Sequence, residues 1–143
     1  MRPSSAKAKG RKLQQWVCKQ ISRFSGLPWG PDENLASREM GQGGWDVRLT
    51  GDAREYFPFG VECKNQETWS VEQWATQSER RMVDQGGRLL TWLLFLKKNR
   101  RRELVVMDAR FFFRLWDEFV TLAESNRNRF PTTSINILEN WDD

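Results

Sequence analysis

The chain has 143 residues with 23 Lys and Arg, 19 Asp and Glu, a formal net charge of +4, and no histidine. This length suits one domain with a modest core. The lack of histidine excludes Ser–His–Asp and Cys–His catalysis, His-ligated zinc and any site with a histidine general base, which leaves carboxylates, lysines and metal ions for chemistry.

The charge is unevenly distributed along the chain. Residues 1–31 hold seven basic side chains and no acidic one, whereas the rest of the chain has a net charge of −3. A basic arm on a mildly acidic body is the pattern of a protein that meets a polyanion at its N-terminus. A solvated leader whose charge aids solubility would have the same composition, and the two alternatives stay open.

The two cysteines, Cys18 and Cys63, form neither a C-x-x-C pair nor a disulfide framework. We therefore expect reduced thiols that pack in the core of a cytoplasmic protein. No stretch approaches the roughly 18 consecutive apolar residues of a membrane helix. The basic N-terminus also lacks the apolar segment of a signal peptide.

In the N-terminal part, residues 1–10 are predicted to form a basic, flexible arm, followed by a helix over residues 11–24. Glycines and prolines between residues 26 and 31 end this helix. One face of the helix is apolar, with spacings of three, four and seven residues. That face consists of Leu13, Trp16, Val17, Ile21 and Phe24, with Cys18 on the same buried side.

Three short strands are predicted next, over residues 34–38, 45–50 and 57–64, with a turn at Gly51-Asp52. In the third strand Phe59, Val61 and Cys63 share one face. Glu62 and Lys64 share the other face, because side chains alternate along a strand.

The C-terminal part begins with a helix over residues 70–85, for which Ser70 and Gln73 form a predicted capping box. Strands follow over residues 89–96 and 103–107, and Asp108 caps a last helix. Both helices have an apolar stripe that we expect to be buried. These stripes are Val71, Trp74, Ala75, Ser78 and Met82 in the first helix, and Phe112, Leu115, Trp116, Phe119 and Val120 in the second.

The order of these elements is α-β-β-β-α-β-β-α, which is typical of an α/β domain with a mixed central sheet flanked by helices. The helix between two buried strands is expected to make a right-handed crossover. We expect a flexible arm over residues 1–10, a single domain over residues 11–124 and a C-terminal tail of undefined structure over residues 125–143.

The candidate catalytic residues are Asp46, Glu62 and Lys64. Glu62 and Lys64 are two residues apart on one strand, which places them about 7 Å apart on the same face. If the strand of Asp46 pairs beside them, its carboxylate joins Glu62 in a hard oxygen site suited to Mg²⁺. The carbonyl of Cys63 is a candidate third ligand, and Lys64 could hold a water or a phosphate oxygen.

This pattern resembles the PD-(D/E)XK nuclease superfamily. Arg38-Glu-Met-Gly-Gln-Gly-Gly-Trp-Asp46, with Lys9-Gly-Arg11 ahead of it, is similar to archaeal-type Holliday junction resolvases. Pro58-Phe-Gly-Val-Glu-Cys-Lys-Asn65, followed by Glu67-x-Trp69, is similar to small bacteriophage endonucleases.

The resemblance implies a restriction-endonuclease-like fold and an Mg²⁺-dependent DNA endonuclease, with Mn²⁺ able to substitute. Asp46 and Glu62 would bind the metal, and Lys64 would be the catalytic lysine. It further implies a homodimer in the cytoplasm of a phage-infected host, with DNA, including branched DNA, as its substrate.

The sequence departs from the family pattern at several positions. Trp45 stands where proline is frequent, and Gln42 where junction resolvases often have serine. Many relatives have a metal-supporting glutamate in the first helix, where this chain has Gln14. That role would pass to Glu39, or no residue would take it. An exposed loop carboxylate is the alternative for Glu39.

Predicted DNA contacts are Lys9, Arg11, Lys12, Arg38 and Gln42. A surface salt bridge is the alternative for Arg38. Trp69 could stack on a base or pack against Trp74, and Arg100-Arg101-Arg102 could contact DNA or be a solvated turn. The alternative functions are a non-catalytic DNA-binding module with the same fold, and an RNA-directed or protein-interaction role of the basic arm.

Overall fold

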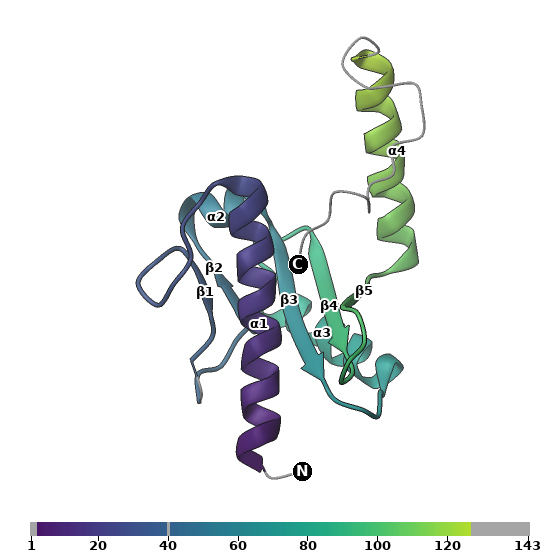
Figure 1. The fold of residues 1–143 in the computed structure, drawn as a ribbon. Helices are drawn as coiled ribbons and strands as arrows, with labels where there is room; N and C mark the ends of the chain where they lie inside the picture. Colours follow the sequence, from purple (N-terminus) through teal and green to yellow (C-terminus); the bar gives the residue numbers. More distant parts are fainter. Residues whose placement is uncertain (1–2, 40, 127–143) are drawn as a thin grey trace. The chain divides into compact units, whose positions relative to one another are not determined.

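The computed structural model describes residues 3–39 and 41–126 (Figure 1). The chain divides into two units, of which the first ends at Met107 and the second begins at Asp108. The first unit contains α1 (Pro3–Ser25), β1 (Leu35–Ser37), β2 (Val47–Leu49), α2 (Gly51–Tyr56), β3 (Phe59–Asn65), α3 (Val71–Gln85), β4 (Thr91–Lys97) and β5 (Leu104–Val106). The second contains α4 (Ala109–Ser125).

The strands of the first unit form two small sheets. In one, β3 and β4 are parallel in the register Phe59↔Thr91, and β5 pairs antiparallel with β4. In the other, β1 and β2 are antiparallel. The predicted α/β architecture, in which α3 connects two parallel strands, is confirmed. The single mixed sheet was wrong, because β1 and β2 pair with each other and no described strand ladder joins them to β3.

The first helix is longer than predicted and begins at Pro3. Residues 3–10, expected in a flexible arm, form its first turns, because Ala and Lys are strong helix formers that extend a helix already anchored by packing. Asn65 Nδ2 also donates a hydrogen bond to the Lys9 carbonyl at 3.1 Å, which attaches this part of α1 to the end of β3.

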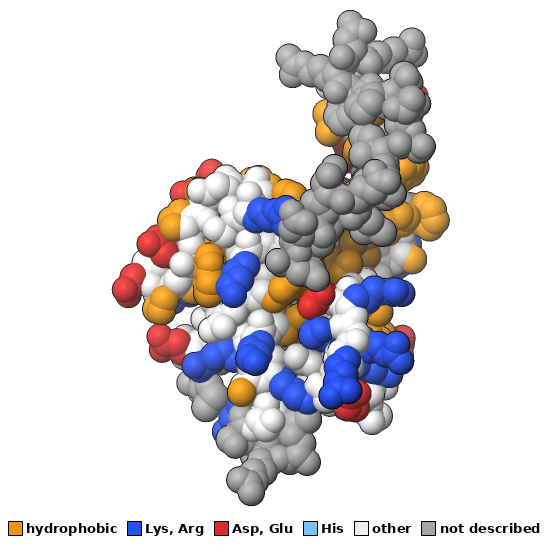
Figure 2. Space-filling model, viewed as in Figure 1, with side chains coloured by type: hydrophobic (Ala, Val, Ile, Leu, Met, Phe, Trp, Pro, Cys, Tyr) orange, Lys and Arg blue, Asp and Glu red, His pale blue; other side chains and the backbone are white. Residues whose placement is uncertain are grey.

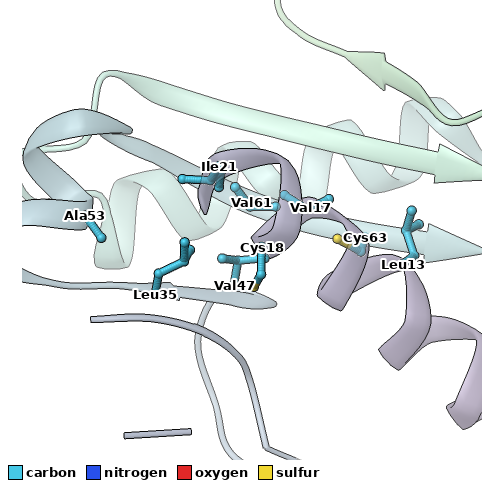
Figure 3. Packing of buried hydrophobic residues seen from close by; sticks show 9 residues of the cluster. All are labelled: Leu13, Val17, Cys18, Ile21, Leu35, Val47, Ala53, Val61 and Cys63. Atoms are coloured by element: carbon cyan, nitrogen blue, oxygen red, sulfur yellow. The ribbon is translucent and has the colours of Figure 1, made fainter. Parts of the chain in front are cut away.

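The first core lies between α1 and one face of β3, with contributions from β1, β2 and α2 (Figure 3). Both cysteines belong to it, as predicted, and burial raises the pKa of Cys18 to about 12. These thiols therefore stay protonated and act as packing groups. The members are Leu13, Val17, Cys18, Ile21, Leu35, Val47, Ala53, Val61 and Cys63.

The second core lies between α3 and the sheet of β3 and β4. The stripe predicted for α3 packs here, with Trp74 and Ser78 buried. Trp69 packs against the same cluster, which favours its structural interpretation. Ser70 occupies the N-cap position, but its side chain makes no capping hydrogen bond, so the predicted capping box was wrong. The buried members are Trp74, Trp92, Leu94 and Leu96.

In the second unit, Asp108 caps α4 as predicted, because its carboxylate accepts hydrogen bonds from the backbone N–H groups of Arg110 and Phe111. The stripe predicted as buried forms an apolar face, but none of its residues is buried. Apolar spacing identifies a helix face and does not identify its partner. Residues 127–143 of the predicted tail lie outside the described residues, and the predicted domain boundaries stay predictions.

Two regions differ further from the prediction. The expected turn at Gly51-Asp52 is the start of the six-residue helix α2, and β4 begins two residues later than expected.

No described helix has both the length and the apolar character needed to cross a membrane.

The close approach of Trp45 to Gly60 in β3 yields a stability prediction. A Cβ on Gly60 would lie 2.4 Å from the Trp45 ring, whereas a Cβ on Gly10 in α1 meets nothing within 4 Å. We expect Gly60→Ala to lower the free energy of unfolding by about 1–3 kcal/mol through overpacking. Gly10→Ala, the matched control, should raise it by about 0.5–1 kcal/mol. Urea unfolding measures both, and equal effects would contradict the packing argument.

Candidate active site

Asp46 connects the β1–β2 hairpin to β3. Its backbone N–H donates to the Val61 carbonyl at 2.8 Å, and its own carbonyl accepts from the Arg38 N–H at 2.9 Å. Its side-chain Oδ2 accepts a hydrogen bond from the Cys63 N–H at 2.8 Å. Asp46 is 6% exposed. These bonds hold its carboxylate directly beside the strand that carries Glu62.

Glu62 faces away from the first core, and its side chain is 13% exposed. Burial raises its pKa from 4.5 to about 8, and the neighbouring Asp46 carboxylate contributes in the same direction by its charge and by a hydrogen bond. Arg81 and Lys64 act in the opposite direction. The predicted convergence of Asp46 and Glu62 is therefore present, and burial together with the Asp46 charge outweighs the effect of the surrounding cations on the pKa of Glu62.

Lys64 lies on the same face of β3 as Glu62, and its Nζ is 5.6 Å from the centroid of the Trp74 ring. The three predicted catalytic side chains line one cleft of about 150 Å³, which has room for a few water molecules. The other polar groups of this cleft are Arg38, Gln77, Ser78 and Arg81.

Two arginines pair with the two carboxylates. Arg38 Nη2 lies 2.9 Å from Asp46 Oδ1, and Arg81 Nη1 lies 2.9 Å from Glu62 Oε1. Both guanidinium groups also donate to the carbonyl of Gly44. The two alternatives for Arg38 were phosphate binding and a salt bridge. In this structure its guanidinium forms a salt bridge with Asp46.

Arg81 is a site residue that the sequence interpretation missed. It lies seven residues after Trp74 and three after Ser78, both of which are buried on the inner face of α3. A charged residue at this spacing belongs to the inward stripe of the helix. This position in the stripe is the feature of the sequence that could have identified Arg81. Gln77 of the same helix also lines the cleft.

Other predicted residues lie outside this cleft. Glu39 is exposed, accepts a hydrogen bond from Gln42 Nε2 at 3.4 Å, and lines a neighbouring cleft. Gln14 accepts a hydrogen bond from the Ser37 hydroxyl at 3.0 Å. Neither Glu39 nor Gln14 joins the carboxylate pair.

The predicted DNA contacts Lys9, Arg11 and Lys12 follow one another along α1. Arg11 and Lys12 are exposed, and Lys9 is half-buried. Figure 2 shows several Lys and Arg side chains on the face that carries α1. The predicted basic cluster from Arg100 to Arg102 is exposed in the turn between β4 and β5. These positions agree with a cationic surface without identifying its partner.

The carboxylate pair fits a small, hard divalent cation. Mg²⁺ takes one or two protein carboxylates and completes its shell with water and substrate oxygens. Glu62 Oε1 is buried and accepts no aligned hydrogen bond, although Arg81 lies beside it. Among the described residues no group of three or more acidic, Cys or His side chains could hold a metal ion, so the pair would depend on water, backbone or substrate for further ligands.

Comparison with known proteins gives one result. A family model described as "Phage putative PDDEXK endonuclease" matches residues 5–141. Curated proteins and solved structures gave no significant match. The match covers most of α1 and the segments that carry Asp46, Glu62 and Lys64. By this match over nearly its whole length, the chain belongs to the phage PD-(D/E)XK endonuclease family.

Proposed function

We propose that this protein is a divalent-metal-dependent endonuclease that hydrolyses phosphodiester bonds in DNA. The observation that supports this most is the pair of carboxylates, with Asp46 buried and Glu62 half-buried, and with Lys64 in the same cleft. A structural ion pair would not need a second carboxylate beside Glu62, whose pKa is raised to about 8, first by burial and then by the Asp46 charge. Two acidic groups in this arrangement suit a site whose cation arrives with the substrate.

In this proposal Asp46 and Glu62 hold Mg²⁺, for which Mn²⁺ can substitute. The bound metal would polarise the phosphate and lower the pKa of a water molecule. The Cys63 carbonyl is a further candidate ligand, because the N–H of Cys63 faces Asp46 and the C=O of a strand residue points to the same side. Lys64 would orient the attacking water or accept its proton. Because Glu39 lines the neighbouring cleft, the proposal assigns it no part in this step.

DNA would lie across the face formed by α1 and the loop that follows Arg38. Lys9, Arg11 and Lys12 are candidate phosphate contacts from the helix, and Arg38 and Gln42 from the loop. Release of the condensed counterions would make binding strongly dependent on salt concentration. We extend the proposal, from the family resemblance alone, to branched DNA as substrate, to a homodimer that cuts two strands and to action in the cytoplasm of an infected host.

Replacing Lys64 tests the catalytic assignment. We expect Lys64→Met to slow DNA cleavage at least about 100-fold, because the water loses its positioning and proton-accepting group. The matched control is Lys97→Met, which removes a lysine of β4 that pairs with Glu103 at 3.4 Å outside the cleft. Cleavage of linear, nicked and four-way-junction DNA with Mg²⁺ or Mn²⁺ measures both variants.

Two outcomes would count against this assignment. Undiminished cutting by Lys64→Met would remove the lysine from the mechanism. Failure of the unmodified protein to cut any of the three DNAs, with DNA binding retained, would favour the non-catalytic DNA-binding module.

The raised pKa of Glu62 predicts how metal affinity depends on pH. Below about pH 8 the carboxyl group carries a proton that a metal ion must displace. Affinity for Mn²⁺ should therefore rise with pH, by up to about tenfold per unit, and level off above pH 8. Isothermal titration calorimetry of the unmodified protein, without DNA, between pH 6 and 9 measures this rise. A flat profile would contradict it, and Glu62→Gln should bind weakly at every pH.

Arg81 should act against metal binding in the absence of DNA. Glu62 is ionised at pH 9 in the unmodified protein, and Arg81→Met removes a cation 2.9 Å from Glu62 Oε1 that repels a divalent ion more strongly than it repels a proton. We expect Mn²⁺ affinity to rise at least about fivefold, since close charges at an effective dielectric near 20 interact by several kcal/mol. Arg80→Met, which changes the exposed neighbour on the same helix, should leave the affinity unchanged. Equal affinities for the two variants would show that Arg81 does not compete with the metal.

A further inference from the structure

A second, larger cleft adjoins the candidate active site. It has a volume of about 440 Å³, and Arg38 lines both clefts. Its walls come from α1, the loop between α1 and β1, and the two strands of the hairpin. The residues with chemical character are Arg11, Gln15, Trp29, Arg38, Glu39 and Arg48. The volume lies within the range of about 300–1,000 Å³ that is usual for small-ligand sites.

The charge of this cleft favours an anion. Arg48 Nη2 donates to the carbonyls of Pro31 and Glu33 at 2.7 and 2.9 Å, and these acceptors are neutral, so no carboxylate within the described part of the chain pairs with it. Arg11 is exposed and has no ion pair among the described residues. Arg38 is balanced by Asp46, so two uncompensated arginines face the single carboxylate of Glu39.

The other walls suit a flat aromatic group with polar edges. Trp29 is half-buried and packs against the first core, and Lys19 Nζ lies 5.9 Å from its ring centroid. An indole held in this way has little freedom to lose when a base stacks on it. The amide of Gln15 and the carboxylate of Glu39 supply donors and acceptors for the edge of a base. An anion next to an aromatic wall and polar edges matches the chemistry of a nucleotide.

We propose that this cleft binds one unpaired nucleotide of the DNA next to the phosphate that is cut. This inference rests on the proposed nuclease function and defines its substrate more closely. In a continuous duplex each base stays stacked between its neighbours, and only phosphates and groove edges reach a concave cleft of this size. A single-stranded end or a branch supplies a base that is free to enter, while Arg38 lies at the boundary between the two clefts.

Binding of two DNAs tests the proposal. Full-length Lys64→Met is titrated, with fluorescence anisotropy as readout, against a blunt duplex and against the same duplex with a short single-stranded overhang. We expect the overhang DNA to bind about tenfold more tightly, as one base–aromatic stack allows. Adding Trp29→Leu should abolish this preference and leave blunt-duplex binding unchanged.

Trp69→Leu is the matched control. Trp69 is also a half-buried tryptophan that packs on a core, with Lys98 Nζ at 4.8 Å from its ring, but it lies outside the cleft. It should retain the preference for the overhang. Because Trp29→Leu could unfold the protein, Gln15→Ala is the second variant, and we expect it to reduce the preference about threefold.

The outcomes separate this proposal from the nuclease assignment. Equal binding of the two DNAs, or a preference that survives both Trp29→Leu and Gln15→Ala, overturns the cleft proposal even if the unmodified protein cuts DNA. A preference for the overhang DNA that is lost in Trp29→Leu supports nucleotide binding in the cleft. If the unmodified protein then cuts neither DNA, only the nuclease assignment fails.

Discussion

The hydrogen bond from the Cys63 N–H to the Asp46 carboxylate is the contact on which the candidate site depends. Together with the bond from the Asp46 N–H to Val61, it attaches the β1–β2 hairpin to β3 at one residue. A buried carboxylate without such a donor would be strongly disfavoured. The same donor fixes the orientation of the carboxylate, so the connection between the two sheets and the geometry of the site have one origin.

The alternation of side chains along β3 then separates the residues that pack in the first core from those that line the candidate active site. Val61 and Cys63 point into the core beneath α1. Glu62 and Lys64 point into the cleft beneath α3. Gly60 leaves the space that the Trp45 ring occupies next to Asp46. A slip of one residue in the pairing of β3 would exchange the two faces and place both charged side chains in the core.

The sequence was sufficient to predict the residues whose positions follow from local rules. Strand alternation and motif spacing predicted that Glu62 and Lys64 share a face, and helical periodicity predicted the inner face of α3. Arg81 was missed because its partner, Glu62, is nineteen residues away in sequence and only the packing of α3 on β3 brings them together. The early start of α1 was missed because helix-forming residues extend a helix only where packing anchors it, and the hydrogen bond from Asn65 to the Lys9 carbonyl joins residues far apart in sequence.

Because β3 contributes to both the first core and the candidate site, few substitutions in this strand would leave both intact. The backbone of Cys63 supplies the N–H that holds Asp46, while its side chain fills the core under α1. Substitutions that repack this core move the same peptide group, because close-packed interiors transmit small displacements. Thermal stability and the alignment of the candidate site therefore cannot be adjusted independently through this strand. Variation that spares the site is expected instead in the turn between β4 and β5, where side chains are exposed.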